Sequence, residues 1–437
     1  MERDIYKKLL AWKQDKYRKP LVLKGARQVG KTYILSAFAK EYSNSLYINF
    51  EEMPDVIPIF SGNLSPANII TQLQIKFGIT ITPKTTLLVF DEIQECAAAL
   101  NSLKYFNEKA NEYHIVSAGS LLGIKLNRTK GFPVGKVDFL DLKPLSFFEF
   151  LDAMGEYRLK EMLLGIKKFI PINEALHQKS IALLKQYFVV GGMPEAVAIY
   201  VKEKDFVKVR KVQRAIVDAY VLDFAKHAAK VDVMKIMAIW EAVAGQLAKE
   251  NKKFIFAAIS KSARAREYEA SIQWLVDAGL IYKSYNISTP KIPLENYANK
   301  NIYKIYMLDI GLLGYMSCLP VNIMLQQQQL FLEFKGALTE NFVVQELMAN
   351  GRVTKTYYWS SAGLAEVDFV IPYELDIYPL EVKAGTSSRK KSLLVYNEKY
   401  HPKNISRATL MNLRRDGEIY NYPLYLVGLF PVKTKRW

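Results

Sequence analysis

Short apolar runs alternate with amphipathic segments through the first third of the chain. The runs predict strands and the helical periodicity predicts helices: strands at residues 21–23, 46–50, 87–90 and 115–116, and helices at 32–41 and 100–111. Continuously apolar runs are typical of strands in a parallel sheet that is covered on both faces. The pattern therefore predicts an α/β fold built on a parallel sheet.

The pattern changes near residue 150, after a connector at residues 142–148 that contains Pro and Phe. Helical periodicity then dominates to about residue 249. Three helical stretches between residues 234 and 285, the last at 264–278, precede short strands at 279–282 and 303–308. Three helices and two strands in this order describe a winged helix. We therefore expect a helical and winged-helix region at residues 151–325.

The remainder of the chain predicts one more domain. A run of four glutamines at 326–329 precedes a helix, three strands, another helix and further strands. A chain of 437 residues is too long for one hydrophobic core, so several domains are expected. We place them at residues 1–150, 151–325 and 326–437.

Composition and charge narrow the class of protein. Half of the residues are hydrophobic, which excludes disorder as the main state. The chain has 60 Lys and Arg against 43 Asp and Glu, a net charge of +17, which favours a polyanionic partner such as nucleic acid or anionic lipid. Cys96 and Cys318 form no CxxC pair. With neither a signal peptide nor an apolar run of membrane-spanning length, we expect a cytoplasmic protein.

A nucleotide site is indicated directly after the first strand. The motif G-x-x-x-x-G-K-[ST] is matched by Gly25, Ala26, Arg27, Gln28, Val29, Gly30, Lys31 and Thr32. The segment follows a strand and opens a helix, which is the context the motif requires. Backbone amides would hold the phosphates of ATP, Lys31 would face the β- and γ-phosphates, and the Thr32 hydroxyl would bind Mg²⁺. The alternative is a glycine turn with an exposed lysine.

Further catalytic candidates follow the next predicted strands. Asp91 and Glu92 end the strand at 87–90, where Asp91 would bind Mg²⁺ and Glu92 would act as general base. Ser120 ends the strand that begins at 115, and its hydroxyl would sense the γ-phosphate; a plain small-residue turn is the alternative. Arg27, Arg128 and Lys136 are candidates to stabilise transition-state charge, in this chain or in a neighbouring copy.

Several segments together resemble a known family. They are residues 25–32, 89–94, 117–124, 132–136, 144–150 and 190–195. The set resembles prokaryotic AAA+ superfamily ATPases of the AAA_14 type that carry a C-terminal domain of unknown function 4143. The resemblance implies a P-loop NTPase domain, a winged-helix-like region and a nuclease-like domain. Unlike many AAA+ relatives, the chain has no arginine-finger motif after the sensor strand, so ring assembly with trans-acting fingers is not implied.

A set of carboxylates and a lysine marks the last domain. Glu340 lies in a predicted helix, Asp368 in a predicted strand at 366–371, and Glu381 and Lys383 in a predicted strand at 378–383. Residues two apart on a strand face one side, so Glu381 and Lys383 would project together and Asp368 could join them from a neighbouring strand. The three carboxylates would bind Mg²⁺, or Mn²⁺ in its place, and Lys383 would orient or activate water.

This segment resembles the core of PD-(D/E)xK nucleases, with a helix at 393–400 in the expected place. Two alternatives stay open: the charges face solvent on an edge strand, or the fold binds nucleic acid without cutting it. Basic residues follow Lys383 in excess: Arg389, Lys390, Lys391, Lys399, Lys403, Arg407, Arg414, Arg415, Lys433, Lys435 and Arg436. They fit a nucleic-acid backbone, although such runs are also common on solvated faces.

The winged-helix region offers a second candidate for nucleic-acid contact. Lys261, Arg264 and Arg266 lie at the start of its third predicted helix, where a groove-entering helix presents its contacts. The alternative is a packing module between domains.

Three functions remain open from the sequence. The first is an ATPase that couples ATP binding and hydrolysis to nucleic-acid engagement, DNA before RNA, with metal-dependent cleavage by the last domain. The second is a nucleotide-switch regulator or scaffold whose last domain binds but does not cut. The third is a basic peripheral protein acting at a membrane or on a protein client, for which no anchor or lipidation motif is present. An oligomer or protein partner is compatible with the first two.

Overall fold

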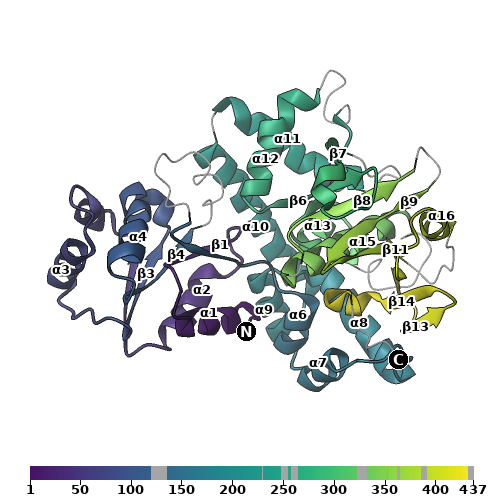
Figure 1. Cartoon of the computed structure of the whole chain (residues 1–437), viewed down its shortest axis with the longest axis horizontal. Helices are drawn as coiled ribbons and strands as arrows, with labels where there is room; N and C mark the ends of the chain where they lie inside the picture. Colours follow the sequence, from purple (N-terminus) through teal and green to yellow (C-terminus); the bar gives the residue numbers. More distant parts are fainter. Residues whose placement is uncertain are drawn as a thin grey trace. The chain divides into compact units, whose positions relative to one another are not determined.

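The computed structural model describes residues 1–119, 135–228, 230–247, 254–256, 264–321, 332–351, 353–361, 365–384 and 391–431. The chain forms two compact units. The N-terminal unit comprises residues 2–143 with 277–279, and the C-terminal unit comprises Met1 with residues 144–276 and 280–437. Figure 1 shows the elements of both.

A parallel sheet forms the centre of the N-terminal unit. Its described strands are β1 (Leu21–Lys24), β2 (Asn44–Asn49), β3 (Thr86–Asp91), β4 (His114–Gly119) and β5 (Asp138–Asp141), in the order β2-β3-β4-β1-β5. Every neighbouring pair runs parallel. The predicted parallel-sheet P-loop fold is confirmed. The edge strand β5 was not predicted, because its residues alternate between half-buried and exposed instead of forming an apolar run.

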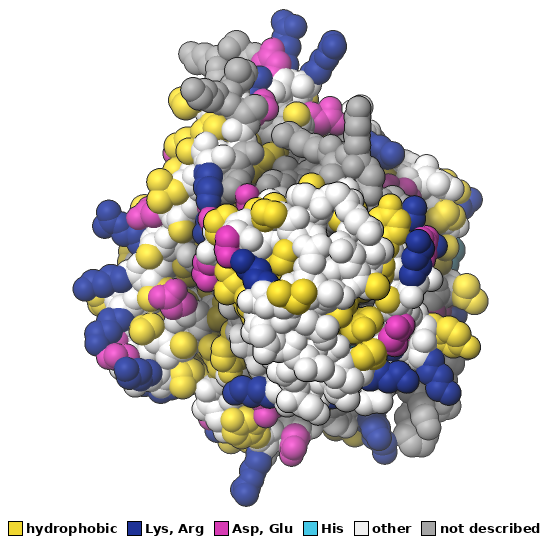
Figure 2. Space-filling model, turned by 90° about the vertical axis from the view of Figure 1, so that its left-hand side faces the viewer, with side chains coloured by type: hydrophobic (Ala, Val, Ile, Leu, Met, Phe, Trp, Pro, Cys, Tyr) yellow, Lys and Arg dark blue, Asp and Glu magenta, His cyan; other side chains and the backbone are white. Residues whose placement is uncertain are grey.

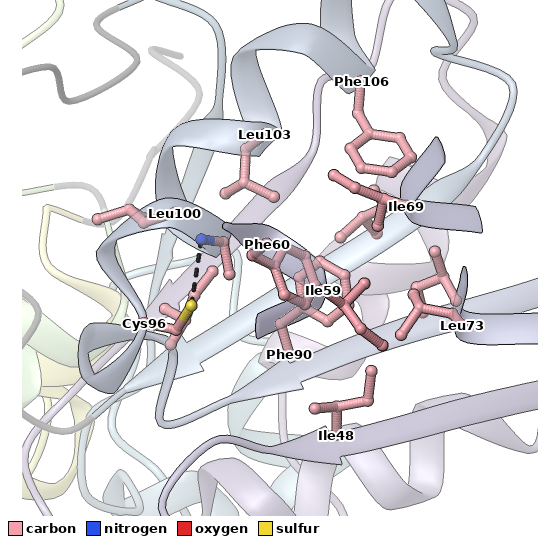
Figure 3. Close-up of a cluster of buried hydrophobic side chains, with 14 of the residues drawn as sticks. Ile48, Ile59, Phe60, Ile69, Leu73, Phe90, Cys96, Leu100, Leu103 and Phe106 are labelled. Atoms are coloured by element: carbon pink, nitrogen blue, oxygen red, sulfur yellow. Dashed lines mark hydrogen bonds between the residues drawn. The ribbon is translucent and has the colours of Figure 1, made fainter. Parts of the chain in front are cut away.

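Helices cover both faces of this sheet. They are α1 (Ile5–Gln14), α2 (Lys31–Ala39), α3 (Pro66–Phe77) and α4 (Ala97–Lys109), with 3₁₀ turns η1 (Pro54–Phe60) and η2 (Ile93–Glu95). Leu88 and Phe90 of β3 pack into one apolar cluster with residues of α3, α4 and η1 (Figure 3). Alternate strand residues face opposite sides, so the equally buried Leu87 and Val89 face the other layer. This two-sided burial explains the unbroken apolar runs.

The first half of the C-terminal unit is helical, as predicted. Its helices are α6 (Phe147–Ala153), α7 (Tyr157–Leu164), α8 (Glu174–Val190), α9 (Pro194–Glu203), α10 (Phe206–His227), α11 (Lys230–Leu247) and α12 (Ala265–Asp277). Phe224 of α10 packs edge-on against Trp240 of α11 and Trp274 of α12, with ring centroids 5.8 and 5.4 Å away. Trp274 therefore belongs to the core that joins these helices.

Two sheets form the second half of the C-terminal unit. The first has the order β7-β6-β8-β9 and the second β10-β11-β12-β14-β13 among the described residues. The strands are β6 (Ile281–Ile287), β7 (Ala298–Met307), β8 (Thr356–Ser360), β9 (Glu366–Val367), β10 (Phe369–Tyr373), β11 (Asp376–Val382), β12 (Ile405–Thr409), β13 (Arg414–Asp416) and β14 (Ile419–Pro423). The accompanying helices are α13 (Ile310–Met316), α15 (Leu332–Ala349) and α16 (Lys391–Tyr400), with 3₁₀ turns η4 (Leu294–Tyr297) and η6 (Leu424–Leu429).

The first of these sheets joins residues from both sides of the boundary expected at 325/326. Strands β6 and β7 form the antiparallel pair expected for a wing, and β6 also pairs in parallel with β8. The hairpin and the last domain thus share one sheet. Both sheets mix parallel and antiparallel pairs, and a nuclease-like fold stays a prediction.

One predicted strand is divided in two. The sequence predicted a single strand at residues 366–371, but β9 pairs with β8 in one sheet and β10 pairs with β11 in the other. Asp368 lies at the break, where the chain passes from one sheet to the next.

No helix within the described ranges combines the length and the apolar character that crossing a membrane requires.

Candidate functional site

The P-loop connects β1 to α2. Gly30 precedes the helix with φ of 95°, a left-handed conformation that glycine adopts without the steric penalty of a Cβ atom. The buried Lys31 follows, and its Nζ donates to the carbonyl oxygens of Gly25 at 3.0 Å and Ala26 at 2.9 Å. The ammonium group is therefore held against the loop at the N-terminus of a helix, where anions bind favourably.

The acidic end of β3 meets the start of α2. The Thr32 hydroxyl donates to Asp91 Oδ2 at 3.1 Å, and the Tyr47 hydroxyl of β2 donates to the same oxygen. The backbone N–H of Glu92 donates to Asp91 Oδ1 at 2.9 Å. Burial, followed by the hydrogen bond to Asp91, raises the pKa of Tyr47 well above its usual range, so Tyr47 remains a donor.

These groups fit ATP and Mg²⁺. A hydroxyl and a carboxylate in hydrogen-bond contact are oxygen ligands of the kind that Mg²⁺ prefers. Thr32 lies next to the P-loop because α2 begins directly after that loop. Its hydrogen bond to Asp91 places the carboxylate at the same end of the sheet. Thr32 and Asp91 would hold the ion, and Lys31 with the loop amides would hold the phosphates.

Glu92 has an unusual backbone conformation. Its φ is 47°, in the left-handed region, which costs a residue with a side chain about 1–2 kcal/mol. Gln94 donates from Nε2 to Glu92 Oε2 and so helps to orient the carboxylate. Strained residues of this kind cluster at functional sites. The geometry is that of a carboxylate presented beside Asp91 and held by a neighbouring amide.

The sensor candidate cannot be placed in the same way. Strand β4 lies between β1 and β3 and ends at Gly119, and Ser120 lies outside the described residues. Within the described part of the chain, the buried Ser117 Oγ has no hydrogen-bond partner. Arg128 also lies outside the described residues.

Lys136 does not lie at the P-loop of its own chain. Its Nζ lies 3.0 Å from Glu108 Oε1, near the end of α4. Lys136 precedes β5, which runs parallel to β1, whereas the P-loop follows β1. Lys136 is thus at the amino ends of the parallel strands, and the P-loop is at their carboxyl ends. This position does not support Lys136 as the candidate that stabilises transition-state charge within its own chain.

Of the four residues predicted for the last domain, Glu340 lies in α15, Glu381 in β11, Lys383 directly after β11, and Asp368 at the break after β9. Lys383 Nζ lies 2.7 Å from Glu381 Oε1. Asp368 Oδ2 accepts a hydrogen bond from the backbone N–H of Val382 at 2.8 Å. The structure therefore places Asp368, Glu381 and Lys383 next to one another. Glu340 and Asp368 both lie within 4 Å of the ammonium group of one further residue, which was not predicted.

That residue is Lys304 of β7. Its Nζ lies 2.5 Å from Glu366 Oε1, 3.7 Å from Glu340 Oε2 and 3.9 Å from Asp368 Oδ1, and its side chain is 1% exposed. Burial lowers the pKa of Lys304, but the carboxylates of Glu340, Asp368 and Glu366 outweigh burial and leave the pKa above its usual value. The Tyr306 hydroxyl donates to Glu340 Oε2 at 2.9 Å.

Within the described ranges, no group of three or more His, Cys, Asp or Glu side chains is arranged to hold a metal ion. The metal-ligand roles of Glu340, Asp368 and Glu381, and the catalytic role of Lys383, stay predictions. What the structure places among the carboxylates is an ammonium group.

The basic residues are dispersed. Arg264 and Arg266 are exposed at the start of α12, whereas Arg407 is buried and paired with Asp416. Lys403 pairs with Asp376 at 2.6 Å. Lys261, Arg389, Lys390, Lys433, Lys435 and Arg436 lie outside the described residues. Figure 2 shows Lys and Arg spread around one face of the molecule, with Asp and Glu between them, and not gathered in a single patch.

Tyr47, Gln94 and Lys304 are the site residues that sequence reasoning missed. Gln94 lies two residues after Glu92, so its closeness in the sequence could have indicated a contact with that carboxylate. Tyr47 and Lys304 come from strands that sequence spacing does not connect to Asp91 or Glu340.

Three family models match parts of the chain. An AAA domain model matches residues 17–151, a domain of unknown function (DUF8612) matches 181–323, and a domain of unknown function (DUF4143) matches 335–426. Lys304 falls in the second of these segments and its carboxylate partners fall in the third. No functionally curated protein matches the chain.

Structural comparison matches the chain to several solved structures. One is the Walker-type ATPase PABY2304 of Pyrococcus abyssi, with 15% sequence identity and a TM-score of 0.46. The match covers 72% of this chain and 95% of that one. The ORC1 protein of Aeropyrum pernix, solved in complex with DNA, has 11% identity, a TM-score of 0.33 and coverage of 75% and 95%. AMPPCP-bound DnaA of Aquifex aeolicus has 14% identity, a TM-score of 0.28 and coverage of 62% and 85%.

Because each of these TM-scores is below 0.5, the assignment rests on the parallel sheet, the P-loop and the family models. The chain thus combines a parallel-sheet P-loop domain that matches the AAA domain model over residues 17–151 with a segment that matches the DUF4143 model over residues 335–426.

Proposed function

We propose that this protein hydrolyses ATP with Mg²⁺ in its N-terminal unit. We further propose that its nucleotide state controls its binding to a nucleic acid, with DNA preferred over RNA. The observation that carries the first part is the hydrogen bond from Thr32 to Asp91, since it brings the end of the P-loop and the acidic end of β3 to one place.

Each residue of this site has a distinct role in the proposal. Lys31 and the amides of residues 25–32 bind the phosphates, and Thr32 and Asp91 hold Mg²⁺. Glu92 accepts the proton of the water that attacks the γ-phosphate, with Gln94 holding its carboxylate in place. Ser120 is proposed as the sensor of the γ-phosphate.

The net charge of +17 supports a polyanionic partner. Exposed Arg264 and Arg266 at the start of α12 are proposed to contact its backbone. Because acidic side chains lie among the basic ones on the face in Figure 2, we expect moderate, salt-sensitive affinity. A homo-oligomer remains compatible with this function.

The C-terminal unit has two candidate roles. In the first, Glu340, Asp368 and Glu381 bind Mg²⁺ or Mn²⁺ and Lys383 activates water for cleavage of a phosphodiester. In the second, the unit binds its partner without cutting, and the protein acts as a nucleotide-dependent switch. The position of Lys304 among the carboxylates favours the second role.

Fluorescence anisotropy tests the coupling. Labelled duplex DNA, single-stranded DNA and RNA are titrated with the full chain without nucleotide, with ADP and with a non-hydrolysable ATP analogue, at about 50 and 200 mM salt. We expect the Kd to rise with salt and to differ between the nucleotide states, and Lys31→Ala to remove the nucleotide effect alone. Equal affinity in all three states would contradict the coupling, while leaving ATP hydrolysis to be judged by phosphate release.

A further inference from the structure

The carboxylate cluster of the C-terminal unit, formed by Glu340, Glu366 and Asp368, contains its own cation. We propose that the ammonium group of Lys304 is the built-in counter-ion of this cluster and occupies the place that a divalent metal ion would take. The unit is then a metal-independent binding module. This inference gives a physical basis to the second candidate role above and does not depend on ATP hydrolysis.

The geometry centres on one nitrogen atom. Lys304 Nζ lies within 4 Å of an oxygen of Glu340, of Glu366 and of Asp368. These residues come from a helix, a short strand and the break between two sheets, and they converge on a side chain from a fourth element, β7. A surface lysine would make one such contact. Three contacts indicate that the cluster is built around this group.

Burial makes a cation at this place necessary. The side chains of Lys304, Glu340 and Asp368 are 1%, 3% and 13% exposed. Carboxylates withdrawn from water repel each other and lose their hydration, so they need a partner of opposite charge. Glu340 and Asp368 find that partner in Lys304, and Glu381 finds Lys383.

Two neutral donors complete the arrangement. The Tyr306 hydroxyl donates to Glu340, and the backbone N–H of Val382 donates to Asp368. The ring of Tyr358 also faces the ammonium group, with Nζ 4.9 Å from its centroid. The buried Glu381 Oε2 has no hydrogen-bond partner in the described part of the chain.

An ammonium group and a divalent ion exclude each other here. A Mg²⁺ ion binds oxygen ligands at about 2.1 Å and would have to share the space between Glu340 and Asp368 with Lys304. Like charges at such a distance repel strongly where water is excluded. Replacing Lys304 by a neutral side chain of similar length should therefore open a latent metal site.

Calorimetric titration of nucleotide-free full chain with Mn²⁺ tests the proposal. We expect the wild type to bind no Mn²⁺ in a manner that Asp368→Asn abolishes, and Lys304→Met to gain about one Mn²⁺ per chain. The double variant Lys304→Met/Asp368→Asn should lose that gain. Wild-type binding that depends on Asp368, or a folded Lys304→Met that gains no Mn²⁺ binding, would overturn the proposal.

Thermal unfolding covers the case in which Lys304→Met folds poorly. The variant should show a lower Tm in EDTA, and Mn²⁺ should restore part of the loss. The double variant Lys304→Met/Glu340→Gln should be more stable than Lys304→Met in EDTA, because it removes a buried charge together with its partner. A double variant no more stable than the single one would contradict the pairing. Lys355→Met is the matched control, since it removes an exposed lysine that pairs with Glu295 at 3.0 Å, and its Tm should stay near the wild-type value.

Discussion

The Thr32 hydroxyl and Asp91 Oδ2 lie 3.1 Å apart, although 59 residues separate them in the sequence. Strand β4 lies between the strands that precede these two residues, so the contact spans the carboxyl edge of the sheet. The contact defines the place where the nucleotide-binding loop and the acidic pair act together.

Replacing Lys31 should strongly weaken nucleotide binding. The change Lys31→Ala removes the ammonium group that lies against the loop carbonyls and that we propose binds the phosphates. A charge-assisted contact to phosphate contributes roughly 1.5–3 kcal/mol, so ATP affinity should fall by about 10- to 100-fold or more. Calorimetric titration with Mg·ATP measures this loss. Lys40→Ala, at the exposed end of the same helix, should bind ATP normally. Equal affinity in both variants would refute the P-loop assignment.

Gly191→Ala should destabilise the C-terminal unit. Gly191 has φ of 73°, and a Cβ there would meet Asp309 Oδ1 and lie 2.8 Å from the backbone of Gly311. The substitution combines backbone strain with overpacking, for which we expect a loss of about 2–4 kcal/mol in the free energy of unfolding. Chemical denaturation measures the change.

Gly245→Ala is the control for that variant. Gly245 lies in α11, and a Cβ there would meet nothing within 4 Å. Because alanine favours helices over glycine, Gly245→Ala should leave stability unchanged or raise it by up to about 1 kcal/mol. Similar losses in both variants would show that the packing around Gly191 is not the cause.

Acid should weaken the N-terminal unit through His114. Burial, followed by the charges of Arg18, Lys13 and Lys84, lowers the pKa of His114 from 6.5 to about 4. As the pH falls from about 6.5 to about 4, His114 is protonated in the unfolded chain but stays neutral in the folded chain. The free energy of unfolding therefore falls over this pH range. Denaturant titrations across this range should show a shallower loss in His114→Phe than in the wild type. Parallel curves for the two proteins would contradict the role of His114.

The sequence predicted the strands that are buried on both faces and missed the edge. Residues 87–90 form an apolar run because both neighbours of β3 and both layers of helices exclude water. Strand β5 has a single neighbour, β1, and carries Asp138 and Asp141 among its four residues. An edge strand with two acids leaves no apolar run, so only pairing with β1 identifies it.

In the candidate sites, too, some residues could be predicted from the sequence and others could not. The P-loop is local in sequence, so its residues could be named from the motif. Tyr47 joins Asp91 only because β2 pairs with β3 in register, with Asn49 opposite Asp91. Lys304 reaches Glu340 and Asp368 only because one sheet joins β7 to β9 while the chain changes sheet at Asp368. Strand register and sheet changes are set by tertiary packing, which spacing along the chain does not encode.

The central claim is that Glu92, placed beside Asp91, drives ATP hydrolysis by the N-terminal unit. Phosphate release from Mg·ATP by the full chain, measured for the wild type, Glu92→Gln and the control Glu95→Gln, tests it most directly. We predict that Glu92→Gln binds ATP with unchanged affinity and loses about 10²- to 10⁴-fold in turnover, while Glu95→Gln retains the wild-type rate. Turnover of Glu92→Gln at the wild-type rate, or no phosphate release by the wild type, would contradict the claim.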